Sequence, residues 1–546
     1  MSVTDTEHGP ASADKGLKSG ALGLVSSVVI GVASTAPAYS LAATLGFVVI
    51  AVGVYAPAIM LVAFLPMLFI AIAYDQLNRR EPDCGTTFTW AAKAFGPRSG
   101  WMGGWGIIAA DVIVMANLAQ IAGIYSFSLF DAIGVHNTLA ESTFWTTVVG
   151  VAWIVVMTWI CYRGIEVSAR MQYFLLGAEV IVLVLFAVTA LVKVYTGHAP
   201  DGSLHFSWSW LNPFGVGDLS AFSDGLLLAV FIYWGWDTAV SVNEESDDPA
   251  KTPGRAAVLS TLLLLATYAI VSIAAQAFAG VGDTGLGLAN PDNADDVFAS
   301  LGEAALGSVG VTLLIIATLT SASASTQTTI LPTARATLSM AVYKAIPRSF
   351  ARIHPRYLTP TVSTIAMGLA SVIFYVALTL ISGNVLADSI TSIGLLIAFY
   401  YGLTGFACAW YFRHELTASV RGFVMKGLLP LVGGLILLGA FIRSAVDMFA
   451  EDYGETSFRG VGGVFLLGVG SLLLGVVLMI ITEIVMPDYF RGRTLTKQTH
   501  PVVLPETRLH TGLRLPDAEE PLVIAADGDP PPATPPPEPA PPPRTP

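Results

Sequence analysis

Apolar stretches of about 20 residues, the length of helix that crosses a bilayer, recur along this chain from Leu22 to Met486. Backbone groups in lipid must bond to one another, and a barrel strand needs only about ten residues of alternating character, so helices are the structure that fits these stretches. Only 12% of the residues are charged, whereas roughly a quarter are charged in an average soluble domain. We predict an all-α integral membrane protein.

The apolar runs predict about twelve transmembrane helices, and the positive residues give their orientation. Of the Lys and Arg residues in the predicted loops, one side of the membrane receives only Lys193, Arg443 and Arg459 before the tail, and the other side receives the rest. The positive-inside rule then predicts that both termini are cytoplasmic. The helices are expected at 22–50, 52–75, 101–130, 144–162, 171–195, 222–243, 256–280, 306–342, 361–382, 386–411, 426–447 and 461–486.

Three regions follow from this pattern. Residues 1–20 form a polar cytoplasmic segment with no cleavage site after it, and residues 21–487 form the helical domain. Residues 488–546 form a tail that is mostly proline from Asp529 onward, a composition typical of disorder. The net charge of -12 comes without a basic stripe, so nucleic acid is not an expected partner. The three cysteines have no CxxC spacing, which predicts neither a disulfide framework nor a metal site.

Two predicted helices carry residues that interrupt a helix. The first holds Gly31 and Pro37, and the sixth holds Gly235 among aromatic residues, followed by Asp237. Two interrupted helices five apart in order are typical of an inverted five-helix repeat, in which broken helices 1 and 6 form a substrate site. Taken singly, the first would be an ordinary proline kink and the second a small-residue packing contact.

Several segments resemble, in order, the amino acid-polyamine-organocation (APC) superfamily of transporters, and in particular its bacterial amino acid permeases. The resemblance covers roughly residues 20 to 485. It rests on Asp75–Trp90 with Phe95–Gly96 and Gly104–Trp105, on Asn243–Arg255 after the sixth helix, and on Arg335, Ala345–Pro347 and Thr359–Pro360 around the end of the eighth.

The resemblance implies that the break in helix 1 receives the carboxylate and amine of a substrate through backbone groups, and that an aromatic residue of helix 6 closes over it. The family's Gly-Ser-Gly stretch falls on Gly31, Val32 and Ala33, so only its first glycine is kept. Hydroxyls of a neighbouring Ser and Thr could serve there, or could bond their own backbone. The substrate-binding candidates are Gly31, Val32, Ala33, Ser34, Thr35, Phe231 as the gate, Tyr233, Trp234, Gly235 and Asp237, with core packing as the alternative for the aromatic residues.

Three acids lie more than one helical turn from either end of a predicted span, where an ionisable group is costly and therefore a functional candidate. For Asp111 the alternative is a polar network with Asn117 and Gln120, and for Asp237 it is a tie to neighbouring helices. Glu179 falls where many proton-coupled relatives carry a lysine, so the resemblance implies the coupling-ion site there. A buried carboxyl group can take up and release a proton near neutrality. The hydroxyls between Thr318 and Thr329 could instead ligate sodium, or could join helices.

These observations predict a permease: a secondary active transporter of amino acids or related amines across the cytoplasmic membrane. We expect proton coupling and alternating access. The alternatives are an exchanger, a sodium-coupled symporter, or a membrane solute receptor. No enzyme is expected, because all eight histidines fall in predicted loops or termini and no nucleophile elbow is present. No cofactor is predicted, and the sequence leaves the oligomeric state and the particular substrate open.

Overall fold

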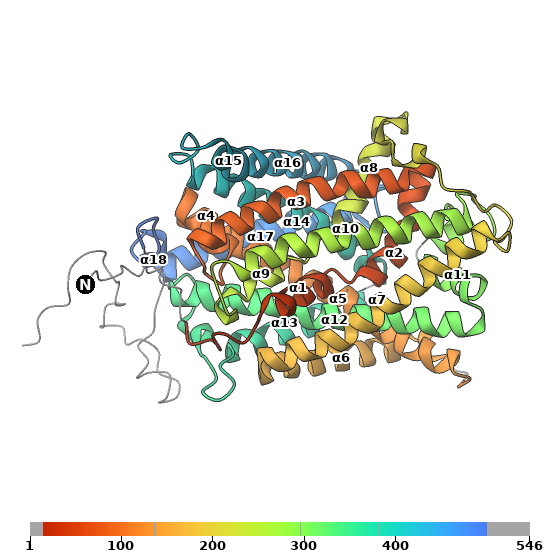
Figure 1. The fold of residues 1–546 in the computed structure, drawn as a ribbon. Helices are drawn as coiled ribbons and strands as arrows, with labels where there is room; N and C mark the ends of the chain where they lie inside the picture. Colours follow the sequence, from red (N-terminus) through yellow and green to blue (C-terminus); the bar gives the residue numbers. More distant parts are fainter. Residues whose placement is uncertain (1–14, 136–137, 295, 382, 500–546) are drawn as a thin grey trace, which may run out of the picture.

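The structure, a computed structural model, describes residues 15–499 except 136–137, 295 and 382 (Figure 1). Within these residues, ten helical stretches are long and apolar enough to cross a membrane. One of them, Leu24–Arg80, contains two crossings, and the broken sixth helix is too short for that count. Twelve crossings result in the described chain, so the all-α membrane fold is confirmed.

The crossings are helix 1 in two pieces, α1 (Leu24–Ser34) and α2 (Pro37–Val52); α3 (Ala56–Arg80), α5 (Pro97–Ala132), α6 (Thr143–Arg163) and α7 (Ile165–Tyr195); helix 6 in two pieces, α8 (Leu219–Ile232) and α9 (Thr238–Ser241); and α10 (Thr252–Ala279), α12 (Ser308–Val342), α13 (Thr361–Ile381), α14 (Gly383–Tyr411), α16 (Leu429–Met448) and α17 (Gly463–Val485).

Shorter elements join these helices. They are α4 (Thr87–Phe95), α11 (Val297–Leu306), α15 (Val420–Gly422), the π-helical turn η8 (Phe423–Leu428), α18 (Pro487–Phe490), the antiparallel pair β1 (Ser457–Phe458) and β2 (Val461–Gly462), and the 3-10 turns η1 (Gly53–Tyr55), η2 (Leu139–Glu141), η3 (Trp208–Leu211), η4 (Pro213–Gly215), η5 (Asn243–Glu245), η6 (Pro291–Asn293) and η7 (Arg348–Ala351).

Both predicted helix breaks are confirmed. Helix 1 stops at Ser34, Ala36 takes a left-handed conformation with φ 47°, and Pro37 starts α2. Proline has no N–H and disfavours helical geometry in the residue before it, yet it is well suited to the first position of a new helix. Helix 6 stops at Ile232 and resumes at Thr238, with Gly235 at φ 115° between them.

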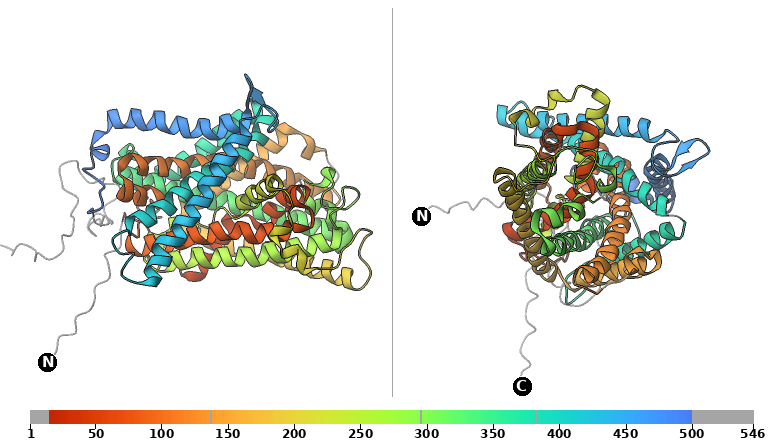
Figure 2. Two further views of the ribbon diagram at one scale, coloured as in Figure 1. Left: turned by 90° about the horizontal axis from the view of Figure 1, so that it is seen from above. Right: turned by 90° about the vertical axis from the view of Figure 1, so that its right-hand side faces the viewer.

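The helix packing follows the order expected of an inverted repeat. Helix α2 packs against α8, α3 against α10, and α5 against α12. These pairs join the first, second and third helices of one five-helix unit to their counterparts in the other. The view along the helices in Figure 2 shows them gathered into one bundle, with α16 and α17 at its periphery.

Among the short helices that were not predicted, the two longest are α4 and α11. Helix α4 lies in the loop between the second and third crossings, and α11 lies between the seventh and eighth. Both are far shorter than a transmembrane helix, so a search for long apolar runs does not find them. Helix α11 still has a start signal, because the Asp296 carboxylate accepts a hydrogen bond of 3.0 Å from the Ala299 amide.

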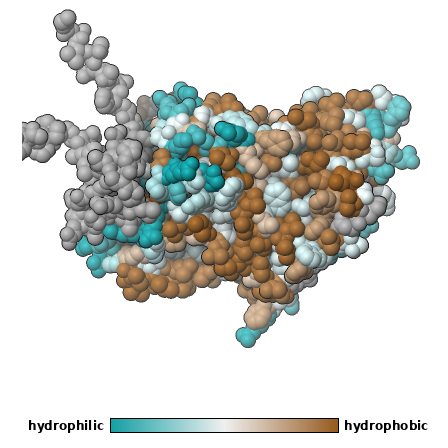
Figure 3. Space-filling view, turned by 90° about the horizontal axis from the view of Figure 1, so that it is seen from below, coloured by the Kyte–Doolittle hydropathy of each residue, from teal (hydrophilic) through white to brown (hydrophobic). Residues whose placement is uncertain are grey.

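The outer surface is apolar, as lipid contact requires. Large side chains such as Phe174, Trp159 and Ile484 are more than half exposed. Figure 3, which looks at the bundle from the side of α6, shows hydrophobic residues over most of this face and hydrophilic residues gathered toward its two ends. Exposed apolar surface of this extent marks a membrane interface.

Both ends of the described chain lie at one end of the bundle, which we call the terminal side. Lys15 contacts Asp83 there, and the Lys93 ammonium bonds the carbonyl of Thr499. Of the predicted tail, residues 488–499 are described and contain most of α18, whereas residues 500–546, with the proline-rich part, lie outside the described residues.

Candidate functional site

The breaks of helices 1 and 6 meet inside the bundle. A methyl group built on Gly235 would lie 2.7 Å from the carbonyl oxygen of Ser34, so only glycine allows this approach. The hydroxyls of Ser34 and Thr238 lie 2.8 Å apart, and the Ser325 hydroxyl of α12 donates to the Ser34 carbonyl at 2.9 Å. The end of α1 is therefore joined both to helix 6 and to helix 8.

The break in helix 1 is narrower than the sequence suggested. Gly31 to Ser34 remain helical, and only Thr35 and Ala36 separate α1 from α2. A methyl group on Gly31 would lie 2.5 Å from the Ser260 hydroxyl and 3.2 Å from the Cβ of Ala239, so this glycine allows close packing against α10 and α9. The Thr35 hydroxyl donates to the carbonyl of Val32 at 2.8 Å, the backbone alternative considered above. Val32 and Ala33 are buried in the core.

Glu179 of α7 reaches the start of α2 and is fully buried. Its Oε1 accepts hydrogen bonds from the Ala38 amide at 2.6 Å and from the Ser321 hydroxyl of α12 at 2.8 Å. A helix N-terminus offers free N–H groups and a partial positive charge, and both favour a carboxylate. In the described part of the chain Oε2 has no hydrogen-bond partner. Glu179 thus connects the fifth helix to the break in the first and to the eighth.

Asp237 lies at the end of the helix 6 break and bonds to α14. Its two carboxylate oxygens accept hydrogen bonds from Tyr401 at 2.8 Å and Tyr400 at 3.3 Å. The Tyr401 hydroxyl also accepts a longer bond, 3.4 Å, from the Gly235 amide, and the Trp234 indole donates to Tyr400. These hydrogen bonds link helix 6 to α14, which is the structural alternative given above for Asp237. The tyrosine pair was missed, although two adjacent tyrosines in an apolar run are a visible sequence signal.

Asp111 does not form the network weighed for it with Asn117 and Gln120. Its carboxylate accepts a hydrogen bond of 2.6 Å from Thr333 of α12. Asn117 instead accepts one from the hydroxyl of Tyr39, and Gln120 lines a cavity of about 190 Å³ near the end of α5. Asn117 and Gln120 are six and nine positions after Asp111, whereas side chains that meet on one helix are three or four positions apart. Their contacts therefore depend on how the helices pack.

The aromatic candidates of helix 6 divide into two environments. Tyr233 is fully buried, donates to the carbonyl of Met60 at 3.2 Å and packs edge-on against Tyr268. Trp234 is also buried, whereas Phe231 is half-buried at the last turn of α8. Tyr233 therefore has the contacts of a core residue, and Phe231 is partly buried against the core.

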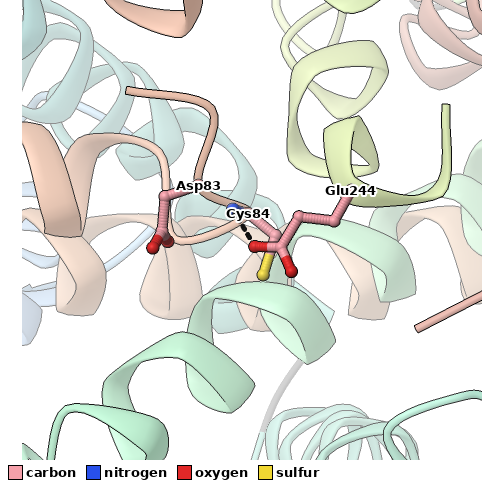
Figure 4. Close-up of side chains that lie close together, drawn as sticks. All are labelled: Asp83, Cys84 and Glu244. Atoms are coloured by element: carbon pink, nitrogen blue, oxygen red, sulfur yellow. Dashed lines mark hydrogen bonds between the residues drawn. The ribbon is translucent and has the colours of Figure 1, made fainter. Parts of the chain in front are cut away.

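A buried charge cluster on the terminal side was not predicted. The Lys15 ammonium lies 2.9 Å from Asp83 and also bonds Glu244, and all three side chains are at most 3% exposed. The Glu244 carboxylate accepts a further bond of 2.9 Å from the Cys84 amide (Figure 4). Burial alone would raise the pKa of the Asp83 carboxyl, but the neighbouring Lys15 ammonium holds that pKa well below its usual range.

A second ion pair lies beside this cluster. Arg335 of α12 donates two hydrogen bonds, of 3.0 and 2.8 Å, to the Glu245 carboxylate, and both side chains are fully buried. The carbonyl of Glu245 accepts bonds from the amides of Ala21 and Leu22. Residues 15–22 are therefore attached to the loop after α3 and to η5, and through Glu245 to α12.

Three groups in this cluster, those of Asp83, Cys84 and Glu244, lie within 4.8 Å of one another and are of types that can ligate a metal ion. Two of them already contact the ammonium of Lys15. The thiol of Cys84 donates to the carbonyl of Arg335 at 3.6 Å. The chain itself thus supplies the cation that these carboxylates require.

The known proteins to which this chain is similar are transporters and permeases. Residues 19–459 match the family described as Amino acid permease. An uncharacterized transporter of Mycobacterium tuberculosis is 28% identical over 74% of this chain and 80% of its own length. The low-affinity putrescine importer PlaP of Escherichia coli is 26% identical over 76% of this chain and 86% of its own, and the branched-chain amino acid permease BcaP of Bacillus subtilis is 25% identical over 56% and 63%.

The fold also has a solved counterpart. The crystal structure of MhsT in complex with L-phenylalanine superimposes with a TM-score of 0.53 and 17% sequence identity, covering 75% of this chain and 98% of that one. The match extends over a helical bundle whose first and sixth helices are broken here at Thr35–Ala36 and between Ile232 and Thr238. The match to the family covers most of the chain, and the chain therefore belongs to the amino acid permease family.

Proposed function

We propose that this membrane protein accumulates amino acids or related amines across the cell membrane by alternating access, driven by protons that bind Glu179. Membership of the amino acid permease family and relatives named as branched-chain amino acid and putrescine transporters support the substrate class. The distribution of Lys and Arg supports placing the terminal side, and with it both termini, in the cytoplasm.

The hydrogen bond from the Ala38 amide to Glu179 carries this proposal. An ionised carboxylate is a strong acceptor at the start of α2, and a protonated one is weaker. Both donors to Glu179 are neutral, so a proton can arrive or leave without breaking an ion pair. Protonation would loosen α2 from α7 and α12 and couple the charge state of Glu179 to movement at the break.

The substrate would bind where the two breaks meet, beside Ser34, Thr35 and Gly235, with Phe231 closing over it. Free backbone groups at helix ends can bind the amine and the carboxylate of an amino acid. The residues 15–22 and the Lys15 cluster would then form the closed cytoplasmic end of the pathway. Opening toward the cytoplasm would require Lys15 to leave Asp83 and Glu244.

Transport by Glu179→Gln in proteoliposomes tests the proton site. The amide keeps the shape of the side chain but does not titrate, so accumulation driven by a proton gradient should be lost while substrate exchange survives. Glu166→Gln is the matched control, because Glu166 lies on the same helix but is half exposed and pairs with Lys18 at the surface. Undiminished accumulation by Glu179→Gln under a proton gradient would refute the assignment.

A sodium-coupled mechanism is the second candidate, and one contact favours it. The Ser321 hydroxyl and the Glu179 carboxylate lie together, and such oxygens are suitable ligands for a hard cation. The same proteoliposomes distinguish the two mechanisms. If accumulation requires a sodium gradient and does not depend on the proton gradient, sodium and not the proton is the coupling ion at Glu179.

A further inference from the structure

The end of α6 on the terminal side carries a tryptophan and an arginine on its exposed face. Val155, Val156 and Trp159 are 56%, 46% and 55% exposed, and this helix lies at the periphery of the bundle. One turn after Trp159, the guanidinium of Arg163 lies 5.1 Å from the centre of the indole ring. Tryptophan is enriched at the level of lipid headgroups, so Arg163 is placed where an apolar helix face meets that layer.

A second arginine approaches from the loop between η7 and α13. The ring of Tyr357 lies 5.2 Å from the guanidinium of Arg163 and 5.7 Å from that of Arg356. One tyrosine ring therefore contacts both cations. His354 stacks on the same ring with 4.4 Å between centroids.

The loop is held in place by hydrogen bonds within the chain. The His354 Nδ1 accepts hydrogen bonds of 3.1 Å from the amides of Arg356 and Tyr357. The Thr359 hydroxyl donates to the carbonyl of Tyr162 at 2.9 Å, which ties the loop to the last turn of α6. A site ordered in advance loses less conformational entropy when it binds.

The charge of this arrangement is not balanced by a nearby acid. In the part of the chain that the structure describes, the ion pairs do not include Arg163 or Arg356, and Glu166, which follows Arg163 closely, pairs with Lys18. Two guanidinium groups on one aromatic ring repel each other unless an anion lies between or beside them. Guanidinium binds phosphate oxygens in pairs of parallel hydrogen bonds.

We propose that Arg163 and Arg356 bind the phosphodiester headgroup of an anionic phospholipid, whose acyl chains lie along the exposed face of α6. The lipid is favoured over free phosphate because the two cations stand at the end of a lipid-facing surface that includes Val155 and Trp159. Bound there, it bridges α6 and the loop before α13, which also contact each other through Thr359 and through the rings of Tyr162 and Tyr357.

Native mass spectrometry of the full chain in detergent measures the binding of phospholipid directly. Phosphatidylglycerol and phosphatidylcholine with identical acyl chains serve as probes. The wild-type protein is expected to retain phosphatidylglycerol in preference, and loss of one charge-assisted contact should weaken that binding about tenfold in Arg163→Gln or Arg356→Gln. Arg421→Gln, which removes an exposed arginine at the start of α15, is the matched control and should keep wild-type affinity.

Thermal unfolding with the same lipids gives a second readout. Phosphatidylglycerol should raise the midpoint temperature of unfolding of the wild type and of Arg421→Gln, and should raise that of Arg356→Gln much less. Arg356 is an exposed loop residue, so Arg356→Gln should fold. Equal lipid affinity in Arg356→Gln and wild type would overturn the proposal. Stabilisation by inorganic phosphate alone, equal to that by the lipid, would also overturn it, because the site would then bind a free anion.

Discussion

Two groups of buried carboxylates in this protein are stabilised in different ways. In the middle of the bundle, Glu179, Asp237 and Asp111 accept hydrogen bonds from an amide, from serine or threonine, and from tyrosines. On the terminal side, Asp83 and Glu244 share the ammonium of Lys15, and Glu245 is paired with Arg335. Among the described residues, the acids in the middle of the bundle have only neutral donors. Each acid of the terminal side lies against a cation, Lys15 or Arg335.

The difference separates a region suited to exchanging charge from one suited to holding shape. A carboxylate bonded to neutral donors can be protonated and still keep acceptable neighbours. A buried acid paired with a cation cannot lose its partner without leaving an uncompensated charge. We therefore expect substitutions in the terminal cluster to affect folding and gating, and substitutions in the middle to affect mainly transport.

The largest expected effect is that of Arg335→Gln. It leaves the Glu245 carboxylate buried without its cation, which costs about 3–5 kcal/mol in comparable pairs. The yield of monodisperse protein in size-exclusion chromatography should fall sharply. Arg79→Gln is the control, because Arg79 is 37% exposed and its pair with Asp75 stabilises by at most about 1 kcal/mol. Normal yield and stability of Arg335→Gln would remove the distinction between the two groups.

The second prediction concerns Lys15 and uses Cys84 as a reporter. Cys84, Cys161 and Cys408 are all buried and free, so Cys161→Ala and Cys408→Ala leave one thiol, that of Cys84, which lies in a buried cluster with Leu17. Lys15→Met should weaken the attachment of residues 15–22 by at least about 1.4 kcal/mol and so raise the rate of Cys84 modification by a maleimide about tenfold.

Lys18→Met provides the control for this measurement. Lys18 lies three residues further along but pairs with Glu166 at the surface, where both side chains are more than 40% exposed. Its loss should change the labelling rate little. If Cys84 reacts at the same rate with and without Lys15, the N-terminal segment does not close this end of the protein.

The third prediction tests the middle of the bundle through Tyr401→Phe. The substitution removes one hydrogen bond to the Asp237 carboxylate, a contact of about 1.5–3 kcal/mol when one partner is charged. Tyr400 remains as a donor, so the protein should fold while substrate uptake falls about tenfold. Uptake and thermal stability measured on the same preparation separate the two effects. A loss of folded protein as large as that of Arg335→Gln would contradict the comparison.

The sequence predicted the helices and their breaks because both depend on local properties. Apolar length gives a crossing wherever it occurs, and Pro37 and Gly235 each weaken a helix locally. Pro66 and Pro332 lie inside continuous helices, so the pairing of the two weak points in helices 1 and 6, and not a single residue, carried the prediction. Glu179 was singled out by a resemblance and by its burial, but its bond to Ala38, 141 residues away in the sequence, depends on how α7 packs against helix 1.

The terminal cluster was missed for the same physical reason. Its members come from residue 15, from the loop after α3 and from η5, and Lys15 and Glu244 are 229 positions apart. Taken alone, Lys15 is one more positive residue before a transmembrane helix, and Glu244 is one more acid in a loop. Only the packed bundle brings them together, and spacing along the chain carries no sign of it.

The smallest expected effect is that of Thr333→Val, which removes the described donor to Asp111. When the Asp111 carboxyl group binds a proton, its bond to Thr333 joins two neutral groups and contributes about 1 kcal/mol, and a buried acid that has lost its donor can reduce its charge in the same way. The midpoint of thermal unfolding should therefore fall only slightly. Thr337→Val is the matched control on the same face of α12, since the Thr337 hydroxyl donates to the carbonyl of Thr333 within its own helix, and its loss should change the midpoint still less. Destabilisation by Thr333→Val equal to that of Arg335→Gln would show that the acids in the middle are held as firmly as those on the terminal side.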